Sequence, residues 1–270
     1  MRRIRKLGGN RALHPDFGGG GEYGIPFEVV PEGEPLVDVA IGDDGYPDES
    51  DFGDGTEGPQ TAPIPLDAPI EGGAGSDGDR HVLVVREGTC DLWEVYRAFA
   101  QPGQGRWVAD ATALFDLSSV ALRPDGWTSA DAAGLPILPG LVRHDEVAAG
   151  SVDHAIRVTF QRTRRAYLHP ATHYASSRCG RSLPPMGLRL RMREGYYDAH
   201  LADFEPGSQA RPILEALRSY GMIVADNGSN FYLTGAASPE WDDDDLGALK
   251  DVPGRAFEVV DSEAPVETPC

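Results

Sequence analysis

The chain has 270 residues, of which 40% are hydrophobic, enough for the core of one large domain or two small ones. Its formal net charge of −19 argues against a nucleic-acid-binding protein, because such proteins neutralise phosphates with Lys and Arg. No apolar run is long enough to cross a membrane. With 33 Gly and 22 Pro, the composition is typical of a loop-rich β protein rather than a helical one.

The first part of the chain is expected to be disordered or truncated over residues 1–12. Basic residues at its start resemble the beginning of a signal peptide, but no apolar stretch follows, so no export signal is expected as written. Residues 12–79 hold 17 acidic residues and no Lys or Arg. Two short apolar runs within them, Ile25–Val30 and Leu36–Ile41, predict strands. We expect residues 43–78 to form a long acidic loop.

Strand signals become denser after residue 80. His81–Val85 and Thr89–Tyr96 flank a turn and predict a β-hairpin. A helix from Asp91 is the alternative, because the apolar residues that follow also fit a period of 3.6. Trp107–Leu117 predicts one further strand.

Two later segments alternate between apolar and polar residues. His154–Phe160 does so cleanly, and Met186–Arg193 places its arginines on one face of a half-buried strand. The whole stretch from His154 to Arg193 holds nine Arg and no acidic residue. Two interpretations stay open: this basic block faces the acidic segments within the fold, or it forms a concave face for an anionic ligand.

Two helices are predicted towards the C-terminus. Ser208 is expected to cap the first, which ends at Gly221. Ser238 is expected to cap the second, which ends near Lys250. Asp242–Asp245 complements the positive end of this second helix, and calcium binding is the alternative.

Between these helices, Met222–Ala225 and Asn230–Thr234 predict a hairpin across an Asn-Gly turn. Many strands and few helices favour a mainly β fold, a β-sandwich or jelly-roll-like arrangement with two or three peripheral helices. We expect a single β-rich domain over residues 13–261 and a disordered tail over residues 262–270.

The chain has three cysteines. A Cys90–Cys179 disulfide is one interpretation, suited to an oxidising compartment, and two unpaired buried thiols are the other. Cys270 is terminal and is expected to be disordered.

Several long segments together resemble a family of uncharacterised secreted proteins of bacteria and fungi. They are LHPDFG (13–18), GIPFEVV (24–30), APIEGG (68–73), GDRHVLVV (78–85), RPDGWTSADAAGLPILPGLVRHDEV (123–147), YLHPATHYASS (167–177), PPMGLRLR (184–191) and YGMIVADNGSNFYLTG (220–235). The resemblance covers roughly residues 13–261 and brings no known activity. It implies that the acidic N-terminal part belongs to the folded domain and that the protein is extracellular.

Residues 123–147 form the most unusual stretch, because they are too rich in Pro and Gly for regular structure and too apolar for a solvated loop. Ordered loops of this kind are often functional. A structural crossover with Trp127 in the core and Asp131 capping a turn is the alternative. Asp131, Glu146 and Asp226 are candidates for the carboxyl pair that glycoside hydrolysis requires.

The basic block suggests a second chemistry. Elimination on a uronate needs a cation or amide at the substrate carboxylate and a Tyr or His that moves a proton. Residues of these types are Arg165, Arg189, Asn227, His173 and Tyr174. A solvent-facing set of arginines is the structural alternative.

A metal site would need imidazoles to converge from different strands. His154, His169 and His173 are the candidates, with Asp226 as a further ligand. Histidines bonded to the backbone are the alternative, and the sequence requires no cofactor. G-x-G-x-x-G occurs at Gly19–Gly24 but lacks the flanking strand and helix of a dinucleotide site.

From these observations we expect an extracellular glycan-active protein, a polysaccharide hydrolase or lyase with its cleft near residues 123–147. The catalytic candidates are Asp131, Glu146, Asp226 and His173. The substrate-binding candidates are Trp127, Arg165, Tyr174, Arg189 and Asn227. A non-catalytic carbohydrate-binding or cell-surface module is the alternative, and in either case the expected partner is a polysaccharide or cell-wall glycan.

Overall fold

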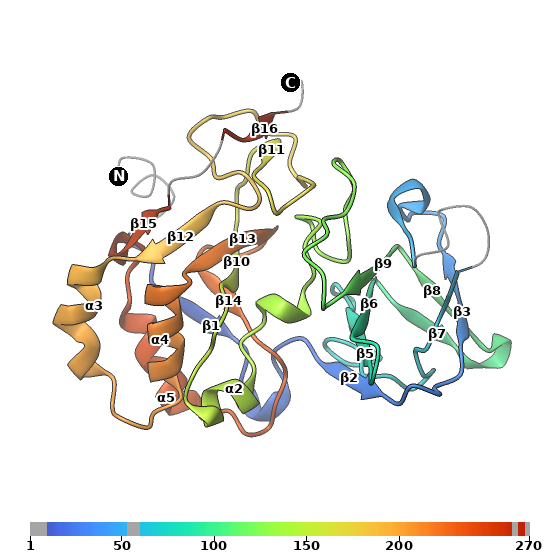
Figure 1. The fold of residues 1–270 in the computed structure, drawn as a ribbon, viewed down its shortest axis with the longest axis horizontal. Coiled ribbons are helices and arrows are strands. Elements are labelled where there is room, and N and C mark those ends of the chain that lie inside the picture. Colours follow the sequence, from blue (N-terminus) through green and yellow to red (C-terminus); the bar gives the residue numbers. More distant parts are fainter. Residues whose placement is uncertain (1–9, 53–59, 261–263, 268–270) are drawn as a thin grey trace.

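The computed structural model describes residues 10–52, 60–260 and 264–267. It is mainly β, as predicted. Figure 1 shows two lobes, one holding β2 to β9 and the other a larger sheet with helices beside it. No sheet closes into a barrel within the described ranges, and the expected sandwich or jelly-roll stays a prediction.

The first lobe contains two four-stranded sheets. In spatial order, the first consists of β2 (Phe27–Val30), β5 (Val82–Arg86), β6 (Asp91–Tyr96) and β9 (Ala111–Asp116), and the second of β4 (Gln60–Ala62), β3 (Val37–Ile41), β8 (Arg106–Ala109) and β7 (Phe99–Gln101). Buried side chains of both sheets, among them Trp93 and Trp107, belong to one hydrophobic cluster. The two sheets therefore share a core.

The sequence predicted four of the eight described strands of this lobe, β2, β3, β5 and β6; β4 and β7 were not predicted, and β4 lies within the expected acidic loop over residues 43–78. The hairpin is confirmed, because β5 and β6 pair in antiparallel fashion, and the alternative helix from Asp91 is wrong. The single strand expected over Trp107–Leu117 is also wrong. The chain passes from one sheet to the other at Asp110, so β8 and β9 belong to different sheets. Both strands are apolar, and the sequence pattern does not mark the change of sheet.

The second lobe is built on a six-stranded sheet. Its order is β1 (His14–Asp16), β14 (Tyr232–Thr234), β10 (Ile156–Phe160), β13 (Met222–Asn227), β12 (Arg189–Met192) and β15 (Phe257–Val259), and a separate pair joins β11 (Ala166–Tyr167) to β16 (Val266–Glu267). Of this last pair, β16 lies in the segment expected to be a disordered tail. On β12, Arg189 and Arg191 are exposed and Leu190 and Met192 buried, as the alternation predicts.

The hairpin predicted over residues 222–234 is wrong. β10 lies between β13 and β14, parallel to the first and antiparallel to the second. The reason is that Ile156, Val158 and Phe160 are fully buried, so β10 takes a central position that an Asn-Gly turn alone does not predict.

The helices are α2 (His144–Ala149), α3 (Glu194–His200), α4 (Ala210–Ser219) and α5 (Asp243–Gly247), with 3-10 turns at Gly19–Gly21, Pro47–Glu49, Pro102–Gln104, Leu138–Gly140, Leu201–Asp203, Ala248–Asp251 and Gly254–Ala256. Both predicted helices are present, but their caps differ from the prediction. No side chain caps α4. Asp242 caps α5, because its extended backbone lets the carboxylate accept the N–H groups of Asp244 and Asp245. Ser238 instead accepts the N–H of Glu240.

The long 123–147 segment packs where the two lobes meet. Its residues Ile137, Leu138 and Leu141 share a buried cluster with Leu83 and Leu92 of the first lobe. In the described ranges, no helix is long and apolar enough to cross a membrane. The Cys90–Cys179 pairing is wrong, because Cys90 is a free, exposed thiol and Cys179 is bonded in another disulfide; Cys270 lies outside the described residues.

Candidate functional site

A buried guanidinium lies at the junction of the two lobes. Arg157 of β10 is 4% exposed and donates to both oxygens of Asp131, at 3.0 Å from Nε and 3.3 Å from Nη2. The same Nη2 donates to Asp226 of β13 at 3.1 Å, and Nη1 donates to Thr234 of β14 at 3.0 Å. The strands on either side of β10 and the 123–147 segment thus all contribute a partner to one side chain.

The carboxylates keep this arginine charged. Burial alone would lower the pKa of Arg157, but the charges of Asp131 and Asp226 hold it above its usual value. Asp131 is fully buried, and both of its oxygens face Arg157. It therefore positions Arg157 rather than facing solvent.

Asp226 is different, because its side chain is 21% exposed. Burial raises the pKa of its carboxyl to about 6; Arg157 opposes this rise, and the charge of Asp131 reinforces it. A carboxyl with this pKa is partly protonated near neutrality, and its accessible edge suits it to exchange a proton with a bound molecule.

A second ion pair from the first lobe adjoins this network. His81 Nδ1 lies 2.6 Å from Glu71 Oε2, and His81 Nε2 lies 3.0 Å from the carbonyl oxygen of Ala130. Since both ring nitrogens face acceptors, both carry protons. Burial would lower the pKa of His81, but the hydrogen bond and charge of Glu71 outweigh it and raise the value to about 9.

Glu71 is the accessible member of this pair, with 28% of its side chain exposed. Burial would raise the pKa of its carboxyl, but the hydrogen bond and charge of His81 lower it below its usual value. Glu71 is therefore ionised at a pH at which Asp226 is still partly protonated. Because Ala130 precedes Asp131 in the chain, the Glu71–His81 pair and the Asp131–Arg157–Asp226 cluster meet through one peptide segment at the lobe junction, and the two together form the network.

Two further groups, Asp16 and Tyr96, border the network. Asp16 of β1 is exposed; burial raises its pKa, and the charges of Glu71 and Arg157 also act on it. The ring of Tyr96 lies 5.7 Å from that of His81, and burial raises the pKa of this phenol to about 12. Several of the segments that carry the family resemblance therefore meet here, since they contain Asp16, Glu71, His81, Asp131 and Asp226.

Glu94 of β6 is a further buried carboxyl, and it contacts the 123–147 segment. It is fully buried, and its carboxyl accepts the N–H groups of Ile137 at 2.8 Å and Leu138 at 3.0 Å. Burial raises its pKa to about 7. This contact holds the 123–147 segment against the first lobe.

The other predicted residues lie in separate places. His173, Tyr174 and Arg165 form one group, in which Arg165 donates to the Tyr174 hydroxyl at 3.2 Å and the His173 and Tyr174 rings stack at 5.2 Å. Asn227 belongs beside this group and Asp226, because its Nδ2 donates to the carbonyl of Ala175 at 3.4 Å.

Three candidates are not part of the network. Glu146 lies on α2, where it pairs with Arg143 and, at 3.2 Å, with His154. Arg189 is exposed and donates to the carbonyl of Tyr220. Trp127 is half-buried in the wall of a separate apolar pocket.

Sequence reasoning missed Arg157, Glu71 and His81. Two signals were available: Glu71 and His81 lie inside the resembling segments, and Arg157 stands between Ile156 and Val158 in a predicted strand. In the part of the chain that the structure describes, no three His, Cys, Asp or Glu side chains gather as a metal site. His154 and His169 instead pair with Glu146 and Asp125, and His173 faces the carbonyl of Ala132.

The comparisons with known proteins assign the chain to no group. No protein-family model, no curated protein and no solved structure matches it significantly.

Proposed function

We propose that this protein is a glycan-active hydrolase whose acid and base are Asp226 and Glu71. One observation carries the proposal: these two accessible carboxyls are joined by a single buried network, and their pKa values are displaced in opposite directions. Glycoside hydrolysis uses such a pair, one carboxylic acid that protonates the leaving oxygen and one carboxylate that activates water or attacks carbon.

The remaining members of the network position this pair. Asp131 fixes the Arg157 guanidinium, which donates to Asp226. Ala130 accepts from His81, which donates through its other nitrogen to Glu71. Both reacting carboxyls are thereby held by buried cations whose own orientation is fixed, as preorganised catalysis requires.

Hydrolysis is favoured over elimination because Arg157, the cation that contacts Asp226, is engaged within the protein, and because Arg189, one of the arginines considered for a lyase, lies outside the network. The Nε, Nη1 and Nη2 of Arg157 all donate within the protein, which leaves it poorly placed to neutralise a uronate carboxylate. Asn227 follows Asp226 in the chain, and its Nδ2 donates to the carbonyl of Ala175, the residue after Tyr174. We propose that Tyr174 and Asn227 contact the sugar.

The cellular location, the partner and the fold type are part of the same proposal. We place the protein outside the cell by the family resemblance, with a polysaccharide or cell-wall glycan as its partner. The two four-stranded sheets that share a core are proposed to form a β-sandwich. A non-catalytic carbohydrate-binding module on this scaffold is the competing function.

The proposal is tested by screening neutral and uronate polysaccharides for new reducing ends, with absorbance recorded for unsaturated products. The Asp226→Asn and Glu71→Gln variants are expected to lose about 100-fold or more in rate. Activity should fall as pH rises through about 6, where Asp226 loses its proton. Asp203→Asn, an exposed carboxyl that pairs with His200, is the matched control. Binding without any product would favour the competing module, and unsaturated products would favour a lyase.

A further inference from the structure

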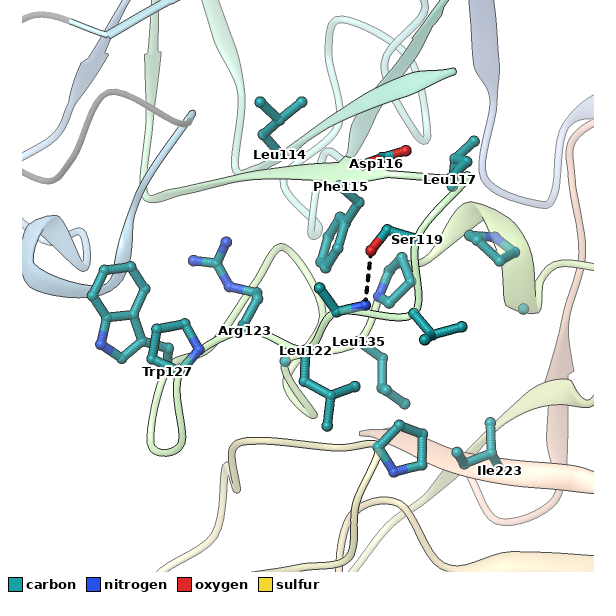
Figure 2. Close-up of a pocket in the computed structure, with 18 of the residues that line it drawn as sticks. Leu114, Phe115, Asp116, Leu117, Ser119, Leu122, Arg123, Trp127, Leu135 and Ile223 are labelled. Atoms are coloured by element: carbon teal, nitrogen blue, oxygen red, sulfur yellow. Dashed lines mark hydrogen bonds between the residues drawn. The ribbon is translucent and has the colours of Figure 1, made fainter. Parts of the chain in front are cut away.

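A pocket lined in part by the 123–147 segment contains none of the network residues. Its volume is about 620 Å³, within the range of roughly 300–1,000 Å³ typical of small-molecule sites. It opens between the end of β9, residues 119–127, residues 134–140 and Ile223 of β13. Figure 2 shows Phe115, Leu122 and Leu135 around the same space, with Ile223 near its lower edge.

The wall of this pocket is mostly apolar. Leu117, Val120 and Leu122 line it and are themselves 39%, 96% and 49% exposed. Exposed apolar area costs about 25 cal/mol per Å² relative to burial. Three such side chains along one short loop, beside a cavity, indicate a surface that an apolar ligand would cover.

The pocket is lined by one cation, Arg123, and by two carboxylates, Asp51 and Asp116. Arg123 lines it, and its side chain lies 5.9 Å from the Phe115 ring centre and 5.4 Å from that of Trp127. Its hydrogen bonds go to the carbonyl oxygens of Thr128 and Glu49, which are neutral acceptors. No ion pair to Arg123 is present among residues 10–52, 60–260 and 264–267.

The electrostatics of Arg123 agree with this geometry. Burial lowers the pKa of its guanidinium to about 10, although the charges of Asp51, Glu94 and Glu49 act in the opposite direction. A partly desolvated cation gains most from a directly bound anion, and a planar guanidinium matches a carboxylate through two parallel hydrogen bonds.

We propose that this pocket binds an amphipathic carboxylate, whose apolar chain lies beneath residues 117–127 and whose carboxylate meets Arg123. The apolar lining receives the chain, and the cation at its wall selects the charged end. This site is independent of the glycan-active site, because none of the network residues lines it.

Calorimetric titration of the full chain with octanoate and with octanol tests the proposal. Octanoate is expected to bind saturably with one site per chain. Leu122→Ser should weaken both ligands about fivefold, because roughly 1 kcal/mol of apolar burial is lost. Leu36→Ser is the matched control, since Leu36 is 60% exposed and lies outside the pocket, and it should change neither affinity.

The charge is tested by Arg123→Gln, which should weaken octanoate about tenfold and leave octanol within twofold. Arg123→Lys keeps the charge but loses the two parallel hydrogen bonds, so its octanoate affinity should lie between those of the parent and Arg123→Gln. Absence of saturable octanoate binding overturns the proposal. So does an equal loss in Leu36→Ser, or an equal effect of Arg123→Gln on both ligands. Asp226→Asn should bind octanoate as the parent does, which separates this site from the glycan-active one.

Discussion

The buried Glu94 carboxyl makes a prediction that can be worked out numerically. Its pKa is about 7 in the folded protein against an ordinary 4.5. A raised pKa means that the folded state binds the proton more tightly, so the stabilisation is complete below pH 4.5 and is lost as pH rises through 7. Integrated between pH 5 and pH 8, this loss amounts to about 2–3 kcal/mol.

Glu94→Gln removes the titration while keeping an oxygen that can accept from Ile137 and Leu138. We expect the variant to lie within about 1 kcal/mol of the parent at pH 5, since both side chains are then neutral. At pH 8 the variant should have gained about 2–3 kcal/mol relative to the parent. The difference between the two proteins is the relevant quantity, because the pKa of His81 is about 9 in the folded chain against an ordinary 6.5, and this shift also makes the stability of both proteins depend on pH.

Urea unfolding followed by tryptophan fluorescence at pH 5, 6, 7 and 8 measures this difference. The slope of the free energy of unfolding against urea should stay the same in both proteins, since the surface exposed on unfolding does not change. Parallel stability curves across the four pH values would refute the reasoning, because they would mean that Glu94 has the same pKa in the folded and unfolded chains.

Two further predictions concern the fold around the network. Asp131→Asn leaves the buried Arg157 without its closest counter-charge and should cost about 3 kcal/mol, a drop of about 6–12 °C in Tm by calorimetry; a cost below about 1 kcal/mol would contradict a buried ion pair. Gly187 has φ +75°, and a Cβ there would lie 2.0 Å from the carbonyl oxygen of Leu168, so Gly187→Ala should cost at least about 2 kcal/mol in urea unfolding. Gly33→Ala, which meets open space, is its control and should stay within about 0.5 kcal/mol of the parent.

The sequence by itself determined the local features of this protein. Alternation in His154–Phe160 and Met186–Arg193 placed β10 and β12, and a Glu-Gly turn placed the β5–β6 hairpin, because such patterns act between near neighbours in the chain. The mainly β class followed from these strands and from the Gly and Pro content.

Only the tertiary structure decided the strand order and the candidate site. Asp131 and Asp226 are 26 and 69 residues from Arg157 in the sequence, and they meet because β10 inserts between β13 and β14 while the 123–147 segment folds over the lobe junction. Pairing between distant segments depends on which surfaces bury each other best, and no local pattern in a single chain contains that choice. Burial in this fold raises the pKa values of Asp226 and Glu94, and the contact with His81 lowers that of Glu71, so the chemistry of these residues depends on the completed fold.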